Sequence, residues 1–246
     1  MRTLTVLVIW ALTAAVPAGQ VLRAPEKTPE QVLVDRAIEA AGGLEALKRH
    51  PAFVWKGEAQ VHVQGKDLKI VGTWSIDPPD KAIVETRQEG QAPEESRTLV
   101  INGRQGFSLV NNVRSQLPAE ILENERDVFY LYALMRLLPL QDYAIRLTAL
   151  PKSEDGLEAL RVTQPERPDV DLFFDADARL RRLLVETLDP VTNTRRRQNV
   201  KLDGEMTSRG IRWFRNLTIT REDGPYFELT ILTLDVLPGL ADPRLR

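Results

Sequence analysis

Cysteine is absent from all 246 residues of the chain, so disulfides, zinc–thiolate sites and thiol nucleophiles are excluded. Histidine is scarce, because His50 and His62 are the only two and lie apart in the sequence. Positive charge is not in excess, with 33 lysines and arginines against 35 acids and a net charge of −2. We therefore expect no cofactor, no metal site and no nucleic-acid partner.

The chain also lacks the short motifs that mark common catalytic sites. There is no GxSxG, HExxH, Walker loop or GxGxxG. Acid pairs such as Asp175 with Asp177 lie in polar, turn-like segments, where solvation explains them more simply than catalysis. We expect that the protein is not an enzyme. A hydrolase that uses two carboxylates is the catalytic alternative.

The first 18 residues have the pattern of a secretory signal peptide. Arg2 supplies the positive start, Leu4–Ala15 the apolar region, and Ala18 the small residue before a cleavage site. We predict that residues 1–18 are removed and that residues 19–246 form a single domain. The mature protein is then exported, and it is periplasmic if the cell is Gram-negative.

The most apolar segment of the mature chain is Val128–Leu140, in which Arg136 is the single charge. A helix that is apolar nearly all round is either buried or faces lipid. Thirteen residues span about 20 Å as a helix, and a bilayer core needs about 30 Å, so this helix is too short to cross. Two interpretations stay open: a core helix packed on a sheet, or a helix that plugs a cavity for an apolar ligand.

Most other segments alternate between apolar and polar residues, as strands with one buried face do. Phe53–Val63 is the clearest example, and turn signals such as Asn102-Gly103 recur along the chain. A helix is expected from the N-cap Thr28 to the stop at Gly42-Gly43, and a second helical region from Pro118 to Leu140. These patterns predict an α+β protein with about 11–12 antiparallel strands, a number that favours a curled sheet.

The combination resembles the LolA-like superfamily of periplasmic lipoprotein carriers. The resemblance is carried by the helix ending in Gly42-Gly43, the following LEALKRHPAFVWKGEAQV, and the LFFDADARLRR segment at Leu172–Arg182. It implies a half-open antiparallel β-barrel whose concave apolar face is covered by helices. It also implies that this face holds acyl chains or other lipophilic groups.

The concave face predicted in this way offers aromatic and flexible apolar side chains for ligand contact. The candidate cavity-lining residues are Trp55, Trp74, Phe107, Phe129, Leu134, Met135, Leu138, Trp213 and Phe227.

Two functions then compete. The first is a monomeric carrier or sensor that binds a lipid or a lipoprotein acyl chain, with a membrane-associated donor or acceptor protein as its partner. The second is a protein-interaction module on the same fold that binds no lipid. Two groups of basic residues could form a patch for anionic head groups or a membrane surface, but we favour solvated strand surface; they are Arg179, Arg181 and Arg182, and Arg195, Arg196 and Arg197.

Overall fold

The computed structural model describes residues 26–245, apart from positions 64, 112, 190, 191 and 193. The predicted signal peptide therefore lies outside the described residues. Within the described part, no helix combines the length and hydrophobicity that are needed to cross a bilayer.

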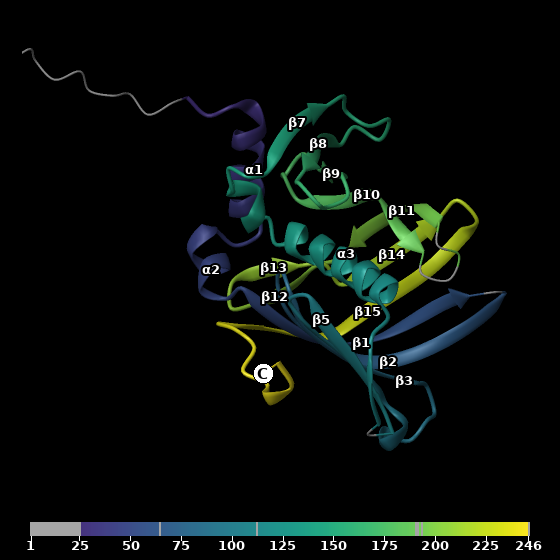
Figure 1. Ribbon diagram of the computed structural model, residues 1–246. Helices are drawn as coiled ribbons and strands as arrows, with labels where there is room; N and C mark the ends of the chain where they lie inside the picture. Colours follow the sequence, from purple (N-terminus) through teal and green to yellow (C-terminus); the bar gives the residue numbers. More distant parts are fainter. Residues whose placement is uncertain (1–25, 64, 112, 190–191, 193, 246) are drawn as a thin grey trace, which may run out of the picture.

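A thirteen-stranded antiparallel sheet dominates the described part of the chain (Figure 1). Its strand order is β6-β5-β4-β3-β2-β1-β15-β14-β11-β10-β9-β8-β7, while β12 and β13 pair separately as a short ribbon. The strands are β1 (Ala52–Val63), β2 (Lys66–Asp77), β3 (Lys81–Gln88), β4 (Arg97–Asn102), β5 (Gln105–Val110), β6 (Val113–Gln116), β7 (Arg146–Leu150), β8 (Glu158–Thr163), β9 (Val170–Phe174), β10 (Leu180–Asp189), β11 (Thr194–Asp203), β12 (Met206–Ser208), β13 (Ile211–Trp213), β14 (Asn216–Arg221) and β15 (Gly224–Leu237).

The sheet curls but does not close, because β6 and β7 lie at its two edges and are not paired with each other. The predicted α+β half-open barrel is confirmed. The described strands number fifteen rather than about 11–12. Part of the excess comes from short strands such as β6, β12 and β13, which have three or four residues each and leave little room for a visible alternation.

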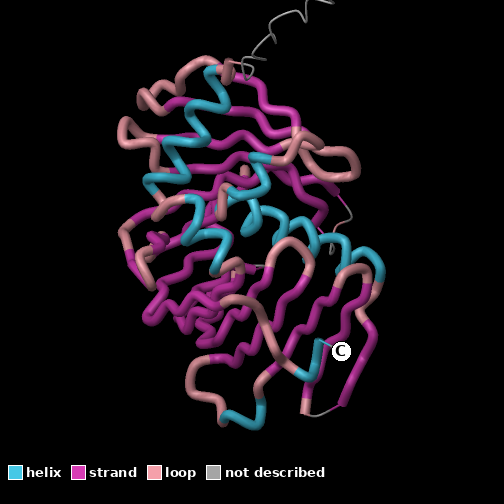
Figure 2. The backbone as a smooth tube through the Cα atoms, turned by 90° about the vertical axis from the view of Figure 1, so that its left-hand side faces the viewer, coloured by secondary structure: helices cyan, strands magenta, loops and turns pink. Residues whose placement is uncertain are grey.

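The helices α1, α2 and α3 lie on the concave side of the sheet (Figure 2). The helical segments are α1 (Pro29–Ala40), α2 (Leu44–Arg49), η1 (Pro93–Glu95), α3 (Ala119–Met135), η2 (Leu138–Gln141) and η3 (Pro243–Leu245). In α1 the capping box is formed as expected, since the Thr28 hydroxyl accepts from the Gln31 backbone N–H and the Gln31 side chain accepts from the Thr28 N–H. The glycine pair Gly42-Gly43 follows, and both residues have positive φ.

Helix α3 runs between the two arms of the curled sheet, with β10 and β11 on one side and β1–β5 on the other (Figure 1). It begins nine residues before the apolar segment that the sequence singled out. It ends at Met135, so that segment is not one continuous helix. Pro139 explains the break, because its ring would clash with the carbonyl of Met135 and it has no N–H to donate. The chain resumes as the short 3-10 turn η2.

The main core lies between α3 and the concave face of the sheet. Strand pairing places Trp55 opposite Trp74, and α3 contributes seven consecutive buried residues from Phe129 to Met135. A second, smaller cluster lies on the convex face, where Leu240 and Leu245 cover Ile83 and Val100. The concave interior is therefore filled by side chains of α3 and of the sheet.

The end of α1 rests against the β12–β13 ribbon, and Gly42 makes this contact possible. The Arg212 N–H donates to the Ala41 carbonyl at 2.9 Å. A Cβ on Gly42 would overlap the Gly210 carbonyl oxygen and lie 3.0 Å from the Ile211 Cα. Only glycine fits this close approach of two backbones.

We therefore expect Gly42→Ala to destabilise the protein more than Gly224→Ala. The two glycines have nearly the same φ, +121° and +123°, but nothing lies within 4 Å of a Cβ on Gly224. Both variants carry the backbone strain, and the Gly42 variant adds overpacking of roughly 1–3 kcal/mol. Urea unfolding of both variants measures the difference. Equal losses would contradict the described contact between α1 and the ribbon.

Candidate ligand-binding site

A row of stacked aromatic rings forms the floor of the concave interior. Phe53 stacks on Trp55 with ring centroids 5.0 Å apart, and Trp55 stacks on Trp74 at 6.4 Å. Trp213, on the β12–β13 ribbon, meets Phe53 at 4.9 Å. The structure thus brings Trp55, Trp74 and Trp213 together in one aromatic cluster.

Helix α3 covers this floor with the side chains predicted for it. Tyr132 packs edge-on to Trp55 at 5.3 Å, and Phe129 lies beside Tyr132 at 6.3 Å. Leu134 has no exposed surface and Met135 is buried, so both belong to the core. Leu138 lies beyond the end of α3, in η2, and is half-buried against the same core.

Phe107 lies on the other face of the sheet, which corrects the sequence-based placement. In β5 it pairs with Val100, and both belong to the convex cluster with Ile83 and Leu245. The concave position on that strand is Gly106, where a Cβ would meet Leu117 and Leu122 of the α3 region. Phe107 therefore does not line the concave interior; the Arg114 guanidinium lies 3.6 Å from its ring centroid.

Phe227 does face the concave side. It pairs with Val61 on β1 and with Ile219 on β14, and it packs against the main core while remaining half-buried. Leu68 continues this row across β2 and is 39% exposed. This end of the concave face is thus less completely covered than the aromatic floor.

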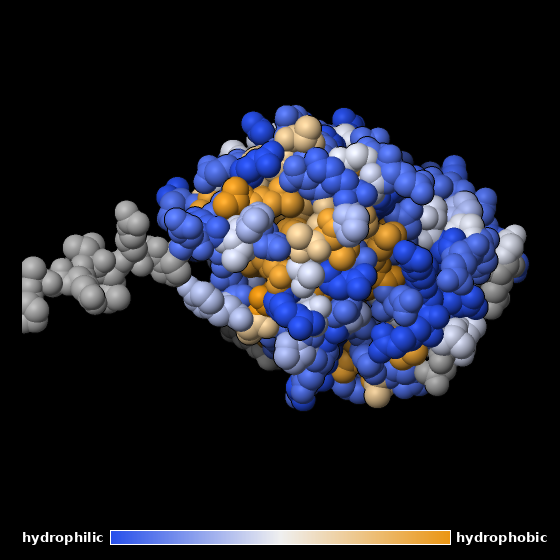
Figure 3. Space-filling model, turned by 90° about the horizontal axis from the view of Figure 1, so that it is seen from above, coloured by the Kyte–Doolittle hydropathy of each residue, from blue (hydrophilic) through white to orange (hydrophobic). Residues whose placement is uncertain are grey.

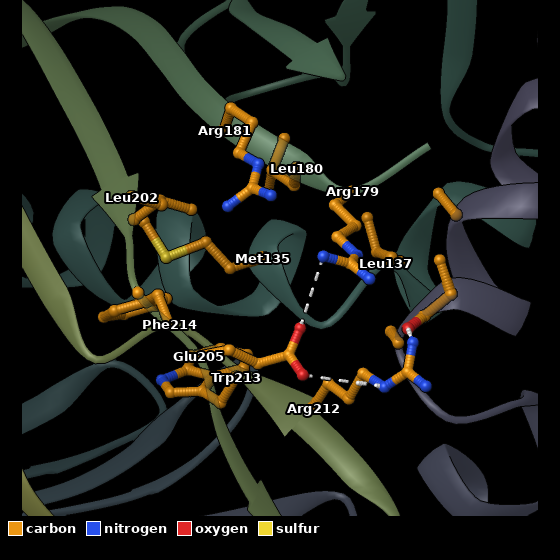
Figure 4. Close-up of a pocket in the computed structure, with 14 residues that line it drawn as sticks. Met135, Leu137, Arg179, Leu180, Arg181, Leu202, Glu205, Arg212, Trp213 and Phe214 are labelled. Carbon is orange, nitrogen blue, oxygen red and sulfur yellow. Dashed lines mark hydrogen bonds and ion pairs between the residues drawn. The ribbon is translucent and has the colours of Figure 1, made fainter. Parts of the chain in front are cut away.

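An apolar cavity of about 80 Å³ opens at the C-terminal end of α3 (Figure 4). It lies between α1, α3, the start of β10, the end of β11 and the β12–β13 ribbon. Its apolar walls come from Ala37, Ala40, Ala41, Met135, Leu137, Leu180, Leu202, Trp213 and Phe214. Because Trp213 also stacks on Phe53, the cavity adjoins the aromatic floor directly.

Charged side chains surround the mouth of this cavity. Glu205 lies between Arg179, at 3.7 Å, and Arg212, at 3.9 Å (Figure 4). Arg212 also donates to the Ala40 carbonyl at 3.2 Å, which ties the ribbon to the end of α1. Outside the mouth, Ala40, Arg179 and Arg212 also line a wider hollow of about 530 Å³ that extends along α1 and is lined mostly by charged residues.

The surface seen from above also combines apolar and charged side chains. Hydrophobic side chains come to the surface in patches among charged ones (Figure 3). An apolar interior with polar rims suits an amphipathic molecule, because its chain and its polar end then find different surroundings. In the described residues, no group of three His, Asp or Glu side chains is arranged to hold a metal ion.

Several site residues were not identified from the sequence. Phe53 could have been identified, because it lies two residues before Trp55 on β1 and therefore shares its strand face. Arg179 and Arg181 line the cavity, although the sequence analysis interpreted their segment as solvated surface. Their position depends on α1 and the ribbon, which are distant in sequence.

Comparison with solved structures defines the fold. A LolA superfamily protein from Nitrosomonas europaea is similar over 88% of this chain and 95% of its own, with a TM-score of 0.57 and 13% identity. A domain from Vibrio parahaemolyticus whose name assigns it to outer-membrane lipoprotein sorting is similar over 87% and 97%, with a TM-score of 0.54 and 10% identity. A DUF1329 family protein from Desulfovibrio piger is similar over 89% and 98%, with a TM-score of 0.55 and 9% identity.

The fold is therefore LolA-like, as the sequence resemblance indicated. No protein-family model matches the sequence, and no curated protein matches it. At 9–13% identity these similarities define the fold and do not identify a ligand.

Glu125, in the N-terminal half of α3, is a half-buried carboxylic acid. It lies one turn before Phe129 on the helix, and burial raises the pKa of its carboxyl group to about 7, an effect that Arg97 on β4 partly offsets. A carboxyl group whose pKa rises on folding favours the folded state less and less as pH increases from about 4.5 to 7.

We expect Glu125→Gln to become more stable relative to the wild-type protein across this pH range. The gain should be on the order of 2 kcal/mol and should level off above pH 7. Urea unfolding at pH 4.5, 6 and 8 measures it, with Glu120→Gln on the exposed first turn of α3 as the control. A stability difference that does not change with pH would place Glu125 in water.

Proposed function

We propose that this is an exported, periplasmic binding protein, not an enzyme, that holds a lipid or a lipoprotein acyl chain in its concave apolar interior. It would act as a carrier or sensor of envelope lipids and would exchange its ligand with a membrane-associated protein. The observation that carries the proposal is the apolar cavity with a charged mouth, placed directly against the aromatic floor. The LolA-like fold supports the same assignment.

The size of the cavity determines how a ligand would enter. Pockets that bury a small organic ligand measure about 300–1,000 Å³, and this cavity has about 80 Å³. A chain must therefore displace side chains from the interior. Met135 lines the cavity and has an unbranched, flexible side chain, so it is the first candidate to move.

The packed interior is also the observation that favours the alternative function. If the aromatic floor and α3 never separate, the same fold serves as a protein-interaction module. The edge strand β6 then offers a surface, because all four of its residues are exposed and Val113 is 64% exposed. An extended partner segment would add to this edge by backbone hydrogen bonds.

Tryptophan fluorescence distinguishes the two functions. Of the four tryptophans, Trp10 lies in the predicted signal peptide, and the other three are buried in the main core. Emission from residues 19–246 therefore reports on the concave interior. We expect a fatty acid brominated near its methyl end to quench this emission at micromolar concentrations, and Trp213→Phe to remove the largest share of the quenching.

A variant that narrows the cavity mouth gives a second test, and a substitution of the same size elsewhere is its matched control. Ala40→Leu adds volume where the cavity meets the outer hollow and should weaken the quenching severalfold. Ala144→Leu adds the same volume at an exposed loop position and should have no effect. No quenching by fatty acid or lipopeptide in the folded protein would reject lipid binding and favour the interaction module.

A further inference from the structure

A second pocket, of about 340 Å³, lies on another face of α3. We call it the proline-lined pocket, because its apolar walls are Pro51, Pro78, Pro79, Leu138, Pro139 and Ile145. Tyr130 and Ala133 of α3 line it, together with Arg136 directly after the end of the helix, and the three are spaced three residues apart. This volume is within the range of pockets that bury small organic ligands.

Arg136 places a buried positive charge beside this pocket. It is 3% exposed, and it forms no ion pair with a carboxylate in the described part of the chain. One guanidinium nitrogen, Nη2, donates to the carbonyls of Leu47 at 3.4 Å and His50 at 2.5 Å, at the end of α2. Its Nε is buried and has no hydrogen-bond partner among the described residues.

Such a charge is expensive to bury unless it is paired. The rings of Phe53 and Trp213 lie 5.6 and 5.9 Å from the guanidinium carbon and offset part of the cost. Burial lowers the pKa of Arg136 to about 10, so the group is still positive at neutral pH. The positive charge of Arg136 is therefore not balanced by a carboxylate of the described residues.

Tyr130 adds a second unpartnered donor. The residue is 3% exposed, and its hydroxyl is buried without a hydrogen-bond partner in the described structure. Burial raises the pKa of Tyr130 to about 12, so the hydroxyl keeps its proton at neutral pH. Arg167 also lines the pocket, but Asp127 lies 3.7 Å from it and balances its charge.

The acid on the pocket wall, Asp142, is exposed to solvent. Its side chain accepts a hydrogen bond from the Ala144 backbone N–H at 2.9 Å. Water therefore screens its charge, whereas the charge of Arg136 is buried. The buried part of the pocket lining therefore carries the positive charge of Arg136, whereas the negative charge of Asp142 lies in solvent.

We propose that the proline-lined pocket binds a small organic carboxylate with an apolar body, whose carboxylate pairs with Arg136 and accepts a hydrogen bond from the Tyr130 hydroxyl. The apolar body lies against the prolines, Leu138 and Ile145. This site is separate from the concave cavity and does not rest on the proposed lipid binding.

Calorimetric titration with 2-naphthoate and its neutral counterpart 2-naphthamide tests the charge. Naphthoate should bind at least tenfold more tightly than the amide, since a hydrogen-bonded charge pair replaces a neutral contact. Using the ligand to vary the charge avoids substituting Arg136, which also holds the end of α2. Equal affinities, or no binding of naphthoate at millimolar concentration, would overturn the proposal.

Protein variants locate the site. Tyr130→Phe should weaken naphthoate binding about tenfold, and Leu138→Trp should abolish it by filling the pocket. Tyr143→Phe removes a hydroxyl from a fully exposed tyrosine and is the control. Ala40→Leu, which narrows the concave cavity, should leave naphthoate binding unchanged. Unchanged affinity in both Tyr130→Phe and Leu138→Trp would place naphthoate elsewhere and contradict the assignment.

Discussion

The packing of α3 on the aromatic floor is the contact on which the rest of the structure depends. An open sheet this large exposes an extensive apolar concave face unless something covers it, and α3 covers it with seven consecutive buried residues. Each buried aromatic ring removes about 150–250 Å² from water. Under the proposed function, a ligand of the concave interior would compete with α3 for the surface of Trp55, Trp74 and Phe53.

The architecture was predictable because most strands are long enough for their alternation to be visible. The three longest strands, β1, β2 and β15, are neighbours in the sheet and have 12, 12 and 14 residues. The misplacement of Phe107 shows the limit of judging a strand by its hydrophobic residues alone. Asn102 pairs with Gln105 across the turn, which puts Gly106 on the concave face and Phe107 on the convex face. The C-terminal residues that bury Phe107 there are distant in sequence, so hydrophobicity suggested the wrong side.

The charged residues show what sequence patterns leave undetermined. Arg136 stood out as the single charge of an apolar segment, but its role depends on carbonyl groups of α2, 86 and 89 residues earlier in the chain. Arg179 and Arg212 meet Glu205 only because α1, β10 and the ribbon converge. As a result, α3 borders two different hollows. One is a small apolar cavity with a charged mouth, and the other is a larger pocket with a buried cation.

Native mass spectrometry of residues 19–246, purified from an exporting host without detergent, tests the central claim most directly. The account predicts a population with an added mass that organic extraction identifies as a phospholipid or acyl chain. A clean unliganded mass, with no uptake of added fatty acid or lipopeptide, would contradict the claim that the concave interior holds a lipid.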